Sequence, residues 1–247
     1  MAVGRTEWAP PDDMLNGRPR SPRPSAYNSP QMFRPILLGH RGARANRSVP
    51  ENTFQSFDLA LAHGCDGFEF DLRRTADGRA VICHDPEFQG VTIAEAKVGQ
   101  LDALPRLDEL LARYAARAFL DIELKVTGLE QCVLTALKAH PPERGYVISS
   151  FLPEVLRTLG SRDSELPLGL LCEDPTQLAE WKNSPAQFVI LHFTLIDGHL
   201  CTLVHAAGKK IFSWTVNGGE AMRRLKDYGV DGIISDETRL LVEVLGS

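Results

Sequence analysis

The chain has 247 residues, of which 43% are hydrophobic and 24% are charged, and its formal net charge is −5 at pH 7. That length suffices for one barrel or two small domains. The acidic balance argues against sequence-independent nucleic-acid binding, which requires clustered Lys and Arg. The longest apolar stretch, residues 188–196, falls short of the roughly 18 to 20 residues of a membrane span. We therefore expect no nucleic-acid partner and no stable membrane insertion.

The first 31 residues differ in composition from the rest of the chain. Prolines recur there among Arg, Ser, Asn and Gly, at Pro10, Pro11, Pro19, Pro22, Pro24 and Pro30. No apolar period is present, which predicts a disordered Pro-rich leader at residues 1–31 and one folded domain at residues 32–247. Because this leader lacks the continuous apolar run of a secretory signal, the predicted location is cytoplasmic.

The cysteines are odd in number, widely spaced and never in a C-x-x-C pair: Cys65, Cys83, Cys132, Cys172 and Cys201. This pattern predicts neither a disulfide framework nor a zinc site. Cys83 precedes His84, but neighbours on a strand point to opposite faces, so a Cys–His nucleophilic pair is not predicted.

From Ile36 onward, short apolar runs alternate with longer amphipathic ones. The short runs predict strands at residues 36–39, 67–72, 118–124, 146–149, 168–171, 188–191, 210–214 and 232–234. The amphipathic runs predict helices at residues 53–63, 107–114, 129–139, 153–159, 176–181, 200–206, 220–228 and 238–245. A turn at Asp77-Gly78 leads into a further apolar run at residues 80–83, which extends the loop after the second strand.

These elements form eight successive β/α units, and such alternation predicts a parallel sheet covered by helices. Eight units in about 210 residues fit a single-domain (β/α)8 TIM barrel of the α/β class, with only a short insertion after the second strand. A doubly wound open sheet is the alternative, but the glycine-rich nucleotide-binding patterns that would favour it are missing from the sequence.

Chemically active side chains follow the predicted strands, which is where a (β/α)8 barrel places its site. Glu69 and Asp71 are two residues apart on one strand, so their carboxylates point to the same face, and Glu123 ends the next barrel strand. Two acids on an apolar strand repel each other unless a cation neutralises them. Three oxygen ligands without Cys suit one Mg²⁺ or Ca²⁺ ion. The alternative is a salt-bridged barrel interior that includes Lys125.

Eight short motifs follow one another along the chain: HRG at 40–42, PENT at 50–53, E-x-D at 69–71, HD at 84–85, E-x-K at 123–125, SSF at 149–151, WTVN at 214–217 and DGIISD at 231–236. In this order they resemble the signature of the glycerophosphodiester phosphodiesterases, from about Ile36 to about Leu245. The resemblance implies metal-dependent hydrolysis of a small-molecule glycerophosphodiester to sn-glycerol 3-phosphate and an alcohol.

The resemblance also implies roles for single residues. His40 and His84 occupy the contexts of the family's two catalytic histidines, one acting as base and the other as acid. Arg41 and Lys125 are candidates for binding the phosphate, although either could instead be a surface or salt-bridged cation.

Two further residues have a structural and a functional interpretation. Trp214 is either a core residue or a wall of the substrate pocket. Glu51 is either structural or orients Arg41 or a metal ligand from behind the site.

One departure from the resemblance concerns the substrate. Only 20 residues separate His84 from Pro105, and they lack the long insertion that many bacterial members carry there. A shorter segment is expected to leave the site more open to bulky leaving groups. This openness favours one alternative function, lysophospholipase D-type hydrolysis with the same site. A noncatalytic phosphate-binding barrel is a separate and less favoured alternative, because both histidines and all the candidate metal ligands are present. The sequence decides neither the leaving alcohol, nor Mg²⁺ against Ca²⁺, nor the oligomeric state.

Overall fold

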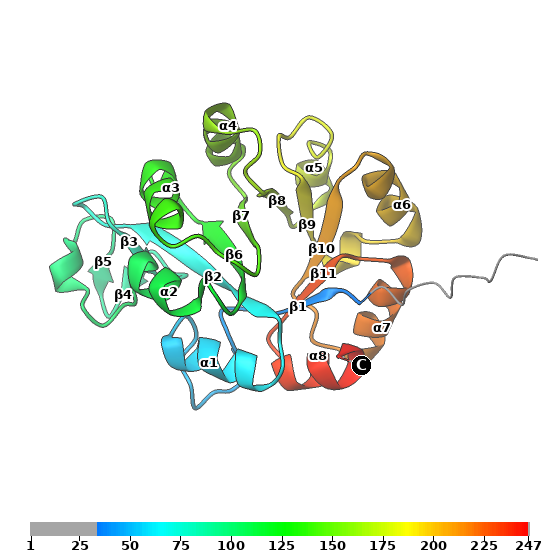
Figure 1. The fold of residues 1–247 in the computed structure, drawn as a ribbon, viewed down its shortest axis with the longest axis horizontal. Coiled ribbons are helices and arrows are strands. Elements are labelled where there is room, and N and C mark those ends of the chain that lie inside the picture. The colour runs from blue at the N-terminus through cyan, green and yellow to red at the C-terminus, as the bar shows by residue number, and fades with distance from the viewer. Residues whose placement is uncertain (1–33, 247) are drawn as a thin grey trace, which may run out of the picture. The chain divides into compact units, whose positions relative to one another are not determined.

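The computed structural model describes residues 34–246 and contains a closed barrel of parallel strands with helices around it (Figure 1). The barrel strands are β1 (Ile36–Gly39), β2 (Gly67–Arg74), β6 (Phe119–Leu124), β7 (Tyr146–Ser150), β8 (Leu168–Cys172), β9 (Phe188–His192), β10 (Lys210–Trp214) and β11 (Gly232–Ser235). Strand β1 pairs with both β2 and β11, which closes the ring. The predicted (β/α)8 barrel is confirmed, and the predicted leader lies outside the described residues.

A helix follows each barrel strand: α1 (Phe54–Ala62), α2 (Leu107–Tyr114), α3 (Glu130–Ala139), α4 (Pro153–Arg162), α5 (Pro175–Leu178), α6 (Gly198–Ala206), α7 (Gly219–Tyr228) and α8 (Thr238–Leu245). Only α5 is clearly shorter than the prediction of residues 176–181. Asp174 caps its start, but the amides of Glu180 and Trp181 bond to carbonyls three residues back, which ends the α-helical pattern. Among residues 34–246, no helix is long and apolar enough to cross a membrane.

The two faces of the barrel strands carry different side chains. On the outer face, Phe57 of α1 stacks on Phe68 of β2 at 4.3 Å between ring centroids, and Tyr114 of α2 meets Phe68 edge-on at 5.0 Å. On the inner face, Phe188 at the start of β9 lies edge-on to Phe212 in the middle of β10, at 5.2 Å between ring centroids. Each such buried ring contributes roughly 1.5–3 kcal/mol relative to exposure. These inner aromatic rings fill the barrel interior on the amino-terminal side. The carboxyl ends of the strands carry the polar groups.

The segment between β2 and α2 forms a small unit of its own. Strand β3 (Ala80–Ile82) pairs antiparallel with the end of β2, and β4 (Glu87–Phe88) pairs with β5 (Val91–Thr92) in a hairpin. A short 3-10 helix, η1 (Val98–Gln100), precedes α2. A separate apolar cluster holds this unit together: Val81, Ile93, Ala96, Leu101 and Leu104. The short insertion is therefore ordered and packed against the barrel rim.

Gly67 begins β2 beside the backbone of β6. A Cβ at this position would lie 1.8 Å from the carbonyl oxygen of Phe119. We predict that Gly67→Ala lowers the free energy of unfolding by about 3 kcal/mol, because the two strands must separate to admit the methyl group. Urea denaturation measures this change. The matched control is Gly99→Ala, whose Cβ meets no heavy atom within 4 Å. Equal stability of the two variants would contradict the argument.

Candidate active site

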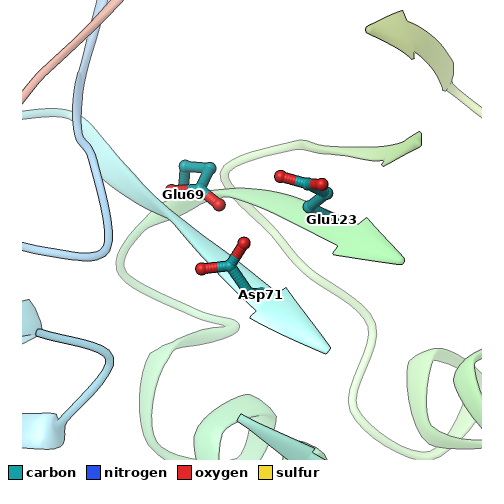
Figure 2. A group of neighbouring side chains, drawn as sticks. All are labelled: Glu69, Asp71 and Glu123. Atoms are coloured by element: carbon teal, nitrogen blue, oxygen red, sulfur yellow. The ribbon is translucent and has the colours of Figure 1, made fainter. Parts of the chain in front are cut away.

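Three carboxylates converge inside the barrel, toward the carboxyl ends of two adjacent strands. Glu69 and Asp71 extend from β2 and Glu123 extends from β6, and Figure 2 shows the three side chains turned toward one another. One oxygen of each lies within 4.8 Å of the others. Their residues are only 4%, 1% and 8% exposed, so water does little to screen the charges.

Two cations and an amide compensate part of this charge. Lys125 Nζ lies 2.7 Å from Glu123 Oε1 and 3.4 Å from Asp71 Oδ1. Arg41 Nε lies 3.3 Å from Asp71 Oδ2, to which Asn52 Nδ2 also donates at 2.8 Å. The salt-bridged arrangement that the sequence left open is therefore present for Asp71 and Glu123.

Glu69 has different surroundings, since no Lys or Arg of residues 34–246 forms an ion pair with it. Its Oε2 accepts a hydrogen bond from the Arg41 amide at 2.9 Å and lies 3.8 Å from His40 Nε2. Its Oε1 is buried without a hydrogen-bond partner. An orphaned carboxylate oxygen beside two further acids offers what a hard divalent cation requires. Glu69, Asp71 and Glu123 therefore fit as ligands for Mg²⁺ or Ca²⁺.

Burial governs the acid strength of this cluster. It raises the pKa of Glu69 well above its usual range and that of Glu123 to about 7, and the nearby charge of Asp71 adds to both effects. Burial opposes ionisation of Asp71 as well, but Lys125 and Arg41 hold the pKa of Asp71 below its usual value. A bound cation would favour the ionised forms of Glu69 and Glu123.

Asp121 is a fourth buried acid, and the sequence analysis missed it. It lies on β6 two residues before Glu123, is fully buried, and accepts a hydrogen bond from Ser149 Oγ at 2.6 Å. Burial raises the pKa of Asp121 to about 7. The two-residue alternation that aligns Glu69 with Asp71 also places Asp121 on the inner face, so the sequence contained the signal.

Asp236, immediately after β11, fixes the ring of His40. The Nδ1 atom of His40 lies 2.7 Å from Asp236 Oδ1. Burial lowers the pKa of His40 and opposes ionisation of Asp236, but the bond to His40 keeps the pKa of Asp236 at about 2. An ionised Asp236 accepts a hydrogen bond from Nδ1–H, which leaves Nε2 of the neutral ring free to accept a proton.

Arginines link the carboxylates around this histidine. Glu51 Oε1 lies 2.7 Å from Arg41 Nη1, and Glu51 Oε2 lies 2.6 Å from Arg44 Nε. Arg44 Nη1 in turn lies 3.3 Å from Asp236 Oδ1. Glu51 therefore contacts Arg41, and Arg44 connects Glu51 to Asp236, the partner of His40.

His84 follows β3 and belongs to the insertion. Its Nδ1 lies 2.8 Å from Asp85 Oδ1, and its side chain is 33% exposed, against 12% for His40. Arg73 Nε donates to its carbonyl oxygen at 2.7 Å, which ties the loop to β2. The two histidines therefore differ in environment, one enclosed and the other at the rim.

One cavity of about 250 Å³ brings most of the predicted residues together. Its walls include both histidines, Arg41, Lys125, Glu69 and Glu123, with Phe151 and Trp214 among the others. Asp71 and Glu51 are outside this lining. Trp214 lies edge-on to Phe151 at 5.5 Å and donates from Nε1 to the Ile190 carbonyl at 3.3 Å, so it is both packed and part of the wall.

Comparisons with known proteins identify the family of this chain. A model of the glycerophosphoryl diester phosphodiesterase family matches residues 40–108 and 109–240 of the chain. The chain belongs to this family. A glycerophosphodiester phosphodiesterase from Caldanaerobacter subterraneus subsp. tengcongensis is 30% identical to it over 85% of this chain and 97% of its own length. The chain is accordingly an enzyme of the phosphoric diester hydrolase class.

Solved structures agree on the fold. A glycerophosphodiester phosphodiesterase from Thermotoga maritima has a TM-score of 0.74 and 25% identity, covering 85% of this chain and 98% of that one. A phosphodiesterase from Oleispira antarctica, solved in complex with the product sn-glycerol-3-phosphate, has a TM-score of 0.76 and 24% identity, covering 87% and 98%. Both likenesses support the single-domain barrel.

The raised pKa values predict how a metal affects stability. Burial raises the pKa of Glu123 from its ordinary value of 4.5 to about 7, so its contribution to stability falls as pH rises from about 4.5 to about 7. Mg²⁺ or Ca²⁺ requires the ionised acid, so the rise in Tm on adding metal should be larger at pH 8 than at pH 6. Thermal unfolding with excess metal or chelator at both pH values measures it. An equal rise would argue against these acids as ligands.

Proposed function

We propose that this protein hydrolyses glycerophosphodiesters to sn-glycerol 3-phosphate and an alcohol, using a divalent cation and two histidines. The supporting observation is one cavity that both histidines line, together with Arg41, Lys125 and acids that fit a cation. A phosphodiester needs this combination, since charge must be stabilised at phosphorus while protons move on two sides of it.

Glu69, Asp71 and Glu123 would hold the cation, either Mg²⁺ or Ca²⁺. When bound, the cation supplies electrophilic stabilisation of the negative charge that develops on the phosphate. Arg41 and Lys125, which both line the cavity, bind the phosphate oxygens, and Glu51 orients Arg41 through their 2.7 Å ion pair. Trp214 contacts the carbon skeleton of the glycerol.

His40 acts as the base and His84 as the acid. Nε2 of His40 takes the proton of the attacking hydroxyl, because Nδ1 is already hydrogen-bonded to Asp236 Oδ1 at 2.7 Å. His84 donates a proton to the alcohol oxygen as its bond to phosphorus breaks. Two nucleophiles meet these requirements. The glycerol hydroxyl would give a cyclic phosphate that water then opens with the histidine roles reversed, whereas direct attack by water would give no such intermediate.

The competing functions have less support. The relatives reported above are named for glycerophosphodiesters, so lysophospholipase D-type hydrolysis is not favoured. A noncatalytic phosphate-binding barrel has no use for two histidines facing one acidic cluster. A cytoplasmic location and the lack of a nucleic-acid partner stay predictions from the sequence.

A substrate panel tests the proposal. We expect glycerophosphocholine, glycerophosphoethanolamine and glycerophosphoinositol to release sn-glycerol 3-phosphate in the presence of Mg²⁺ or Ca²⁺, with phosphorus NMR as the measurement. Excess chelator and Glu69→Gln should each reduce turnover by at least about 100-fold. Full activity in chelator would exclude the metal, and turnover of lysophosphatidylcholine alone would favour the lysophospholipase D-type function.

The two histidines should respond differently to the leaving group. His40→Ala and His84→Ala should each lower kcat by roughly 10² to 10⁴, the range for a lost general acid or base. The leaving group of a p-nitrophenyl ester, p-nitrophenolate, departs without protonation. This substrate should therefore restore the kcat of His84→Ala and not that of His40→Ala. His199→Ala, an exposed histidine outside the cavity, is the control. Equal rescue of both variants would refute the assignment of roles.

A further inference from the structure

A second cavity of about 590 Å³ shares His84 with the first. Its walls come from residues 50–53 ahead of α1, from residues 82–85 and 87–89 around β4, and from residues 103–105 ahead of α2. His84 is the one residue that lines both cavities. The short insertion, expected from the sequence to leave this side open, therefore provides a wall beside the proposed acid.

The two cavities differ in charge. The first contains Arg41 and Lys125, whereas the described residues that line the second include neither Lys nor Arg. Three carboxylates line the second: Glu51, Asp85 and Glu87. Glu51 is neutralised by two arginines and Asp85 is bonded to His84, but Glu87 has no side-chain hydrogen bond or ion pair within residues 34–246.

The wall that carries Glu87 is held in place. Phe88, next to it on β4, lines the cavity and packs against the apolar cluster of the insertion. In that cluster Ile93 is 1% exposed, and its amide bonds to the Pro86 carbonyl at 3.0 Å. Leu104, which is 7% exposed, contributes to both the cluster and the cavity. An apolar surface with an aromatic ring and free carboxylate charge is suited to an alkylammonium group.

We infer that the second cavity receives the leaving alcohol and selects cationic alcohols, such as choline, over neutral ones. The inference rests on the proposed function, in which His84 protonates the leaving oxygen. With the phosphate held by Arg41 and Lys125 on one side of His84, the alcohol extends to the other side. A cavity of about 590 Å³ exceeds the size of a small alcohol, so charge rather than size determines the preference.

Inhibition by free alcohols tests this selection directly. Choline and its uncharged isostere 3,3-dimethyl-1-butanol should both compete with a p-nitrophenyl ester of glycerol phosphate, and choline should bind roughly three- to tenfold more tightly. Glu87→Gln should reduce that ratio by about threefold, the effect of one exposed ion pair. Glu95→Gln, an exposed carboxylate of the same segment outside both cavities, should leave the ratio unchanged.

Substrate hydrolysis separates this inference from the proposed function. The kcat/KM for glycerophosphocholine should exceed that for glycerophosphoinositol by about tenfold, and the ratio should fall in Glu87→Gln. Equal kcat/KM values with equal inhibition by the two isosteres would overturn the cation selection and leave the hydrolase intact. Failure to hydrolyse any glycerophosphodiester would overturn both. Circular dichroism and Tm confirm that the variants fold.

Discussion

Four carboxylates buried on two adjacent strands are the constraint on which the rest of the site depends. Removing such charges from water costs several kcal/mol for each ion unless partners compensate it. Each acid has at least one such partner. Asp71 is bonded to Asn52 and paired with Arg41, and Asp121 accepts a hydrogen bond from Ser149. Glu123 forms an ion pair with Lys125, and Glu69 accepts a hydrogen bond from the Arg41 amide. Carboxylate oxygens that are buried without a hydrogen-bond partner, such as Glu69 Oε1, reduce the stability of the fold and could bind a cation.

The barrel makes this arrangement possible because the packing outside the strands and the packing inside them are separate. The helices and the outer strand faces bury large aromatic and aliphatic side chains, and the inner aromatic layer closes the barrel below the acids. The acids therefore lie on strands fixed from both sides and need no movement to converge. The histidines are placed differently, since His40 is enclosed by Asp236 and His84 is carried by the packed insertion at the rim.

The sequence predicted those features that depend on local pattern. Short apolar runs predicted the strands, and the two-residue spacing of Glu69 and Asp71 predicted that both acids lie on one face. Features that depend on contacts between distant segments were not accessible. Asp236 was visible at the end of the last strand, but its bond to His40 spans 196 residues. Likewise, Thr53 caps α1, and the bond from Asn52 to Asp71 joins the loop before this helix to β2. The second cavity likewise requires residues 50–53 to meet residues 82–85 and 87–89.

The bond between His40 and Asp236 joins the loop after the first strand to the loop after the last, across the seam where β1 pairs with β11. During synthesis, β1 leaves the ribosome long before β11 exists, so the nearest partner of this histidine arrives at the end of the chain. The orientation of His40 by Asp236 is therefore coupled to ring closure, and a partly folded chain with all three acids in place would still lack this contact. The ring of His40 is therefore held in its final orientation only after the last strand has paired with the first.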